Sequence, residues 1–191
     1  MAIKLLSKVV NGIKGGVTST IKGTADVGST IVNSVKDLTV TTLKGTSELL
    51  VKGIQLPASI VKGAIDGLSN IGVSLIKAVK GIVSGTVQGL MSQGVEQKDA
   101  VAGSVQQAIY SAKELGENVG MVAVESIKGG VSGVKQVGGD TVSATKTAVI
   151  AALEAARDVG GGTTDVVKAA LSDGVEGAKK ILDELKKDEK A

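Results

Sequence analysis

The chain of 191 residues contains no cysteine and no histidine. These two absences exclude disulfide bonds, thiolate zinc sites, cysteine nucleophiles and histidine-based catalytic triads. Aromatic residues are nearly missing too, because there is no phenylalanine or tryptophan and a single tyrosine, Tyr110. Since aromatic side chains dominate the energetics of ordinary protein cores, this composition disfavours a conventional globular core.

No sequence motif for catalysis or cofactor binding is present. The acidic residues are scattered, and adjacent ones such as Asp183 and Glu184 point to different helix faces. The stretch "GGDTVSATKT" lacks the Gly-Lys-Ser/Thr ending of a phosphate-binding loop. The stretch "DVGGGTTD" is typical of a helix end followed by a helix start. We therefore expect a protein that is not an enzyme and that binds no cofactor and no metal.

Charge is distributed unevenly along the chain, although the net charge is only +3. Residues 1–90 contain ten lysines and four acidic residues, whereas residues 91–191 contain twelve basic and fifteen acidic residues. A basic first half is drawn to anionic surfaces. Nucleic acid is not an expected partner, because the lysines are spread singly, there is one arginine, and no aromatic set is available for base stacking.

No signal peptide and no transmembrane span are evident. Lys4, Lys8 and Lys14 interrupt the first apolar stretch. The longest uncharged run, 81–95, has fifteen residues, whereas a helix needs roughly 20 to cross a bilayer. We expect a cytoplasmic protein, peripheral at a membrane or lipid body. Whether residues 59–95 insert into a membrane stays open at this point.

Apolar and small residues recur in steps of three and four from Val101 to Leu185, with a period of about 3.65 residues. This value lies close to eleven residues per three helical turns. Valine, isoleucine and threonine also favour strands, but strict alternation is rare in this chain. The pattern predicts an all-α protein of long, glycine-rich amphipathic helices, with the possibility of disorder when lipid or a partner is absent.

Helix-breaking residues divide the chain, and breaks are predicted near Pro57, at 94–98 and at 159–163. The predicted helices cover about 3–55, 59–93, 98–158 and 164–189, with kinks or internal breaks allowed in the first and third. Four segments follow: 1–56, a basic amphipathic helix; 57–95, an apolar glycine-striped helix; 96–159, an amphipathic helix; and 160–191, a charged C-terminal helix.

A branched apolar residue followed by Lys-Gly occurs seven times, for example at Val61-Lys62-Gly63. A lysine beside an apolar stripe lays its stem along that face and lifts its charge outward, as at the edge of a lipid-facing helix. The stripe supplies the predicted lipid- or partner-facing residues, which are Ile13, Val17, Ile21, Ile31, Val35, Val61, Ile71, Leu75, Ile82, Val131, Val149 and Leu153.

A second stripe consists of glycines in near-helical steps. Small residues four apart allow the backbones of two helices to approach closely. The predicted helix-packing residues are Gly63, Gly67, Gly81, Gly85 and Gly89.

The stretch "IKGGVSGVKQVGGDTVSATKTAV" resembles the eleven-residue repeats of synucleins and of the perilipin lipid-droplet coats. The C-terminal "GGGTTDVVKAALSDGVEGAKKILDELKKDEKA" looks more like late-embryogenesis-abundant desiccation proteins. The resemblance implies a chain that is mobile in water and helical on lipid. It concerns the style of the repeat, because the Lys-Thr-Lys-Glu-Gly-Val core and the long acidic tail of synucleins are absent.

Three functions are consistent with these patterns. The first is a non-enzymatic protein that coats a lipid surface, expected to be anionic. The second is a structural or scaffold subunit whose helices self-associate into a bundle, tube or filament, and a homo-oligomer is expected. The third is a stress-protective disordered protein or an unrecognised globular α domain. Lipid dependence separates the first from the second.

Overall fold

The computed structural model describes residues 2–21, 27–44 and 55–188, and within these ranges it contains nine helices and no strand. The prediction of an all-α protein is therefore confirmed. The helices are α1 (Ala2–Ile21), α2 (Val27–Lys44), α3 (Gln55–Ser69), α4 (Leu75–Ser92), α5 (Gln97–Glu114), α6 (Val119–Gln136), α7 (Thr141–Val159), α8 (Thr163–Gly174) and α9 (Ala178–Asp188).

A unit of 22 residues, one helix and one turn, repeats through the middle of the chain. The helices α4, α5 and α6 each have 18 residues, and α4 to α8 begin 22 residues apart. A glycine with positive φ recurs at the same spacing in the turns, at Gly72, Gly94, Gly116, Gly138 and Gly160. The period that the sequence shows at eleven residues therefore appears in space as a folded unit of twice that length.

Four of these five turns share one hydrogen-bond pattern, whereas the turn after α7 carries three glycines with positive φ, Gly160, Gly161 and Gly162. Gly72 donates its N–H to the carbonyl of Ser69, and Val73 donates to the carbonyl of Leu68, both at 3.1 Å. This pair of bonds is the Schellman motif, in which a glycine in the left-handed region closes a helix end. The same two bonds recur at Gly94–Val95, Gly116–Glu117 and Gly138–Gly139. In these four turns, one glycine with positive φ is thus enough to reverse the chain.

The predicted helices are too long. A turn at 70–74 divides the range 59–93, and a turn at 175–177 divides the range 164–189, although each was expected to form one helix. Turns at 115–118 and 137–140 divide the range 98–158, for which kinks or internal breaks were allowed. A single glycine costs a helix only roughly 1 kcal/mol, so the sequence pattern does not separate a tolerated glycine from one that ends a helix. The predicted breaks at 94–98 and 159–163 do contain turns, and Pro57 lies in the first turn of α3.

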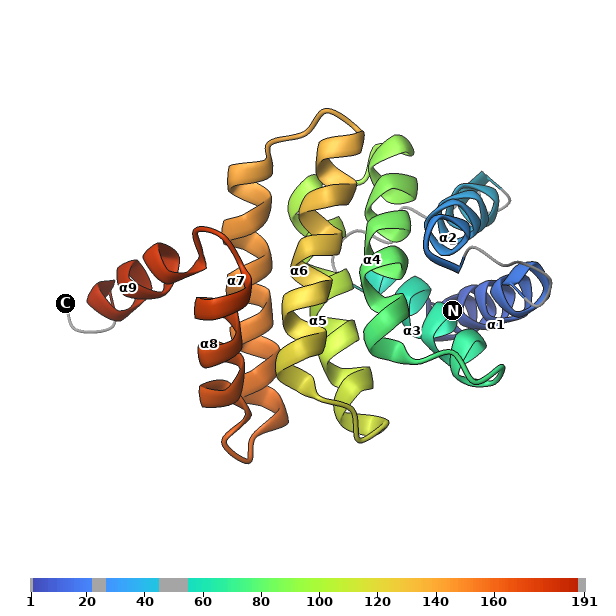
Figure 1. The fold of residues 1–191 in the computed structure, drawn as a ribbon. Coiled ribbons are helices and arrows are strands. Elements are labelled where there is room, and N and C mark those ends of the chain that lie inside the picture. The colour runs from blue at the N-terminus through green and yellow to red at the C-terminus, as the bar shows by residue number, and fades with distance from the viewer. Residues whose placement is uncertain (1, 22–26, 45–54, 189–191) are drawn as a thin grey trace.

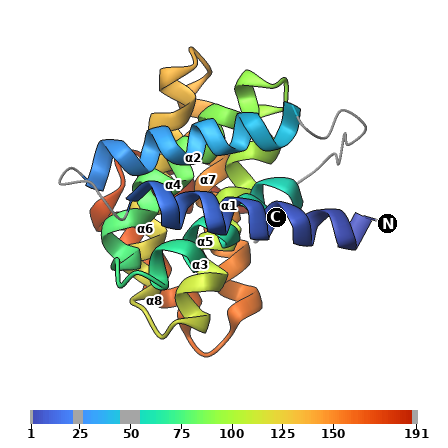
Figure 2. The same ribbon diagram turned by 90° about the vertical axis from the view of Figure 1, so that its right-hand side faces the viewer.

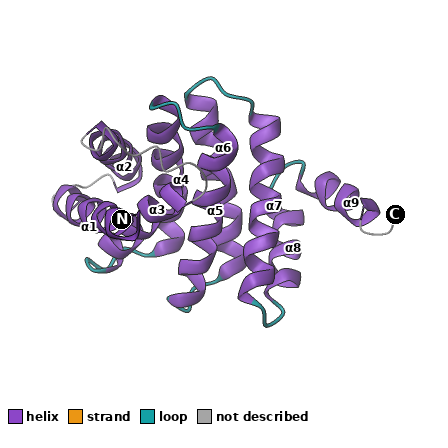
Figure 3. Ribbon diagram, turned by 180° about the vertical axis from the view of Figure 1, so that it is seen from behind, coloured by secondary structure: helices purple, strands orange, loops and turns teal. Residues whose placement is uncertain are grey.

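The helices form two layers, with odd-numbered helices in one and even-numbered helices in the other. Within a layer, α1, α3, α5 and α7 contact one another in order, as do α2, α4, α6 and α8. Figure 1 shows the even layer facing the viewer, and Figure 3 shows the odd layer from behind. Stacking of one repeat on its neighbours is the arrangement of a helical solenoid.

The core runs between the two layers as columns of equivalent residues. One column takes a residue from each successive unit, and all of its side chains have 0% exposure; its members are Val61, Val83, Val105, Ile127, Val149 and Leu171. Among the described residues, valine, isoleucine, leucine and alanine supply the whole hydrophobic core. A core of small and branched side chains needs no aromatic residues when the helix backbones lie close together.

The two ends of the solenoid differ. At the N-terminal end, α1 and α2 lie side by side and face the viewer in Figure 2. At the opposite end, α9 contacts α7 and α8 (Figure 1). The α9 helix buries Ala178 and Leu182 and exposes lysines and acidic residues. In Figure 1, α9 points outward from this end of the stack.

Candidate functional site

The two predicted packing glycines of α3 lie against the backbone of α1. A Cβ placed on Gly63 would lie 2.5 Å from the carbonyl oxygen of Val10, and one on Gly67 would lie 2.8 Å from that of Lys14. Side chains essentially never come this close, so these contacts require glycine. The hydroxyl of Thr18 on α1 also joins these two helices, because it donates a hydrogen bond of 3.1 Å to the carbonyl oxygen of Gly67 on α3.

The three predicted packing glycines of α4 meet α2 in the same way. A Cβ on Gly85 would lie 2.5 Å from the carbonyl oxygen of Val32, and one on Gly89 would lie 2.6 Å from the Cβ of Thr39. Gly81 leaves more room, with 3.0 Å to the nearest side-chain carbon of Ile31. Since successive glycines meet successive turns of α2, the two helices run in the same direction.

Two further packing glycines were missed by the sequence analysis. A Cβ on Gly129 of α6 would lie 2.5 Å from the carbonyl oxygen of Lys80, and one on Gly133 would lie 2.8 Å from that of Ser84. These glycines follow Gly85 and Gly89 by 44 residues, which is two repeat units. That spacing is visible in the sequence and would have identified them. All of these glycines hold neighbouring helices of one layer together.

Most of the predicted lipid- or partner-facing residues lie in the core of the chain itself. Nine are buried with at most 8% exposure: Ile13, Val17, Ile31, Val35, Val61, Leu75, Ile82, Val149 and Leu153. Ile71 and Val131 are half-buried. Ile21 ends α1, but its side chain falls outside the described residues. In the folded chain the apolar stripe therefore faces other helices, and lipid can reach it only if helices separate.

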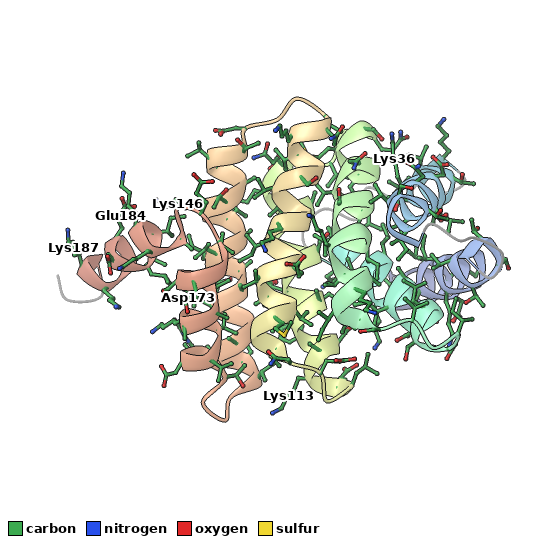
Figure 4. The ribbon with its side chains drawn as sticks, in the orientation of Figure 1. Lys36, Lys113, Lys146, Asp173, Glu184 and Lys187 are labelled. Carbon is green, nitrogen blue, oxygen red and sulfur yellow. The ribbon has the colours of Figure 1, made fainter. Side chains whose placement is uncertain are left out.

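The large apolar side chains that the described residues expose are few, namely Leu115, Met121, Val137, Val142 and Val166. Leu115 and Val137 lie at helix ends beside turns. Val142 is the most exposed, at 79%, and stands in the first turn of α7. Figure 4 shows charged side chains such as Lys113, Lys146 and Lys187 projecting outward from the helices.

A groove of about 780 Å³ opens on the even layer, between α4, α6, α7 and the end of α8. Its walls combine three lysines, Lys80, Lys128 and Lys135, with the side chains of Val131, Val142 and Val175. These six residues define what we call the lysine groove. Glu176 is the single acidic residue among its lining side chains.

The odd layer contains a small polar cluster around the single tyrosine. The Tyr110 hydroxyl of α5 donates a hydrogen bond of 2.8 Å to the carboxylate of Asp158 on α7. Partial burial, this hydrogen bond and the negative charges of Asp158 and Glu154 raise the pKa of Tyr110 from 10.0 to about 12. Gln106 donates a parallel bond of 3.0 Å to Glu154. The cluster fastens α5 to α7.

Among the residues that the structure describes, no three histidine, cysteine or acidic side chains come together to hold a metal ion. Within the same ranges, no helix combines the length and the apolar character needed to cross a membrane.

Comparisons with known protein families, with curated proteins and with solved structures found no match to this chain.

Proposed function

We propose that this protein coats an anionic lipid surface, and that it does so by opening its solenoid so that the apolar stripe meets lipid. The observation that carries the proposal is the length of the repeat. Twenty-two residues make six turns of a helix with about 3.67 residues per turn. Buried residues of successive units, such as Val83, Val105 and Ile127, are 22 residues apart. The stripe thus keeps its phase from one helix to the next.

A phase that continues across the turns has a physical consequence. If the turn residues became helical, the stripes of successive helices would join into one apolar face along a longer helix. A solenoid with short loops does not need an apolar stripe that keeps its phase across the turns, because each turn can orient its own helix separately. Amphipathic helices bind lipid through such a continuous face flanked by lysines.

The interactions that hold the fold closed are of a kind that lipid can replace. The core consists of aliphatic side chains, and burial against acyl chains stabilises these by the same hydrophobic effect as burial against other helices. The chain has no cysteine, so no disulfide opposes opening. The lysine excess of residues 1–90 favours the first encounter with an anionic surface.

The test uses a disulfide that locks two helices of one layer. A Cβ on Gly81 lies 3.3 Å from the Cβ of Ile31, close to the roughly 3.5–4.5 Å of a disulfide. The Ile31→Cys/Gly81→Cys variant therefore fixes α2 on α4 when oxidised and releases it when reduced. Binding to phosphatidylglycerol vesicles is measured by flotation, and helix content by circular dichroism.

The oxidised variant is expected to bind vesicles at least fivefold more weakly than the same variant in its reduced form. The reduced form of the same protein is the matched control, because only the bridge differs. Equal binding in both states would show that lipid does not require these helices to separate. Absence of vesicle binding by the native chain would refute the coating function itself.

A second candidate function is a self-associating scaffold, and the exposed face of α1 favours it. Gly63 of α3 packs on α1. The equivalent position in α1, two repeat units earlier, is Ser19, and its side chain is exposed. A Cβ on Gly12 or Gly15 would meet no described atom within 4 Å. Concentration-dependent light scattering in lipid-free buffer distinguishes this function, since a scaffold assembles without lipid and a coat does not.

A further inference from the structure

The lysine groove exists because α8 is shorter than its neighbour in the same layer. The α6 helix has 18 residues and α8 has 12, and in Figure 1 α8 ends short of the level that α6 reaches at its C-terminus. The last turns of α6 and the first turn of α7 are thus left without a covering helix. Their side chains, with Lys80 of α4 and the residues that follow α8, line the open space.

The floor of the groove is apolar, and its walls combine valines with the hydroxyl side chains of Ser132, Thr141 and Thr145. Ile127 at its base has 0% exposure, Val131 and Val175 are half-buried, and Val142 is exposed at 79%. Helix packing accounts for Ile127, which belongs to a core column, but not for the exposure of Val142. The volume, about 780 Å³, lies in the range of small-molecule sites, roughly 300–1,000 Å³. An aliphatic chain therefore fits both the chemistry and the size of the groove.

The rim of the groove is positive. Lys128 pairs with Glu125, at 3.0 Å between Nζ and the carboxylate oxygen. Lys80 and Lys135 form no ion pair with any described residue. Glu176 is the one acidic group of the lining. Two unpaired ammonium groups beside an apolar floor favour a ligand with an anionic head and an aliphatic tail, because lysine binds phosphate as a point charge.

We propose that the lysine groove binds one single-chain lipid with an anionic phosphate head, the chain lying along Val131 and Val142 and the phosphate between Lys80 and Lys135. The choice of a lipid rests on the proposed coating function, but binding in the groove needs no opening of the fold. The groove would hold a lipid while the apolar stripe is still buried.

The probe is dodecyl phosphate, below its micelle concentration, titrated into the full chain by calorimetry. One molecule is expected to bind per chain. The Lys80→Gln/Lys135→Gln variant is expected to bind about tenfold more weakly, and Val142→Asn about threefold more weakly. The matched control is Lys113→Gln/Lys187→Gln, which removes two exposed lysines that do not line the groove and is expected to bind like the native chain.

Three results would overturn the proposal: no saturable binding of dodecyl phosphate, equal weakening by the control variant, or equally tight binding of inorganic phosphate or dodecyl maltoside. Either of the first two results would show that the groove is not the binding site. The third would show that binding does not require both a phosphate head and an aliphatic chain. Circular dichroism of each variant establishes that it is folded.

The oxidised Ile31→Cys/Gly81→Cys variant separates this inference from the coating function. Its bridge joins α2 to α4 and leaves the residues of the groove unchanged. Dodecyl phosphate binding should persist in the oxidised protein while vesicle coating is lost. If coating fails in the native chain and dodecyl phosphate still binds, the groove stands and the coating proposal falls; the reverse pattern removes the groove alone.

Discussion

Gly85 of α4 lies directly against the carbonyl oxygen of Val32 on α2, so closely that a Cβ on Gly85 would be 2.5 Å from that oxygen. Neither group can move aside easily, because both belong to helix backbones. This contact explains why glycines recur within helices of this chain. The helix loses roughly 1 kcal/mol of propensity at each glycine and in return two backbones approach each other closely.

Replacing Gly85 by alanine should therefore destabilise the protein, although alanine is the better helix former. Overpacking of this kind typically costs about 1–3 kcal/mol, which exceeds the gain in propensity. Thermal unfolding followed by circular dichroism should give a lower midpoint. Gly15→Ala is the matched control, because a Cβ there meets no described atom within 4 Å, and it should leave the midpoint unchanged or raise it.

The turn glycines should respond differently in solution and on lipid. Gly116 has φ of +68° and open space around it, so alanine there is opposed by conformation alone, at about 1–2 kcal/mol. Gly116→Ala should lower the thermal midpoint in buffer. Because it favours a helical backbone at the turn, it should also lower the vesicle concentration needed for half-maximal binding.

The control for this turn variant is Gly130→Ala, inside α6. A Cβ on Gly130 would make an ordinary contact of 3.5 Å with Val101, so the substitution should be tolerated in buffer. A Gly116→Ala variant that is destabilised in buffer and also binds vesicles more weakly would count against opening at the turns.

Tyr110 should titrate at unusually high pH. Its pKa is raised to about 12 in the folded chain, from 10.0, so the folded state holds the phenolic proton more tightly than the unfolded state. This contribution to stability is complete below pH 10 and is lost as pH rises through 12. Absorbance of tyrosinate, the single aromatic chromophore, gives the midpoint directly.

Asp158→Asn should move that midpoint downward, because it removes the carboxylate that accepts the Tyr110 proton at 2.8 Å. Protein unfolded in guanidinium should titrate near the ordinary value of 10.0. An unchanged midpoint in Asp158→Asn would mean that burial alone raises the pKa.

Thr86 offers a stabilising substitution. Its side chain is fully buried in α4, and its hydroxyl oxygen has no hydrogen-bond partner. Thr86→Val keeps the shape and removes the unpaired polar group, so the free energy of unfolding should rise by about 1 kcal/mol. Chemical denaturation measures it. Ser104→Ala is the contrast, because that hydroxyl donates to the carbonyl of Ala100 at 2.7 Å and its loss should not stabilise.

The sequence by itself determined that this protein is helical and which residues avoid water. Val61, Ile82 and Val149 stand out by their spacing alone, and all three are buried, because a stripe at helical period leaves one face that must be covered. Gly81, Gly85 and Gly89 could be recognised as a close-packing stripe for the same geometric reason. Composition alone also excluded cysteine and histidine chemistry.

Only the tertiary structure decided what covers the stripe. Sequence periodicity records which residues are apolar, and lipid, a second chain and a neighbouring helix of the same chain are equally apolar partners. Only the structure decided which glycines end helices. Gly116 has positive φ and closes α5, whereas Gly129 stays inside α6, and both carry the same intrinsic helix cost. Gly129 allows the close approach of α4, since a Cβ there would lie 2.5 Å from the carbonyl oxygen of Lys80, whereas a Cβ on Gly116 would meet no described heavy atom within 4 Å and that glycine serves the turn through its positive φ.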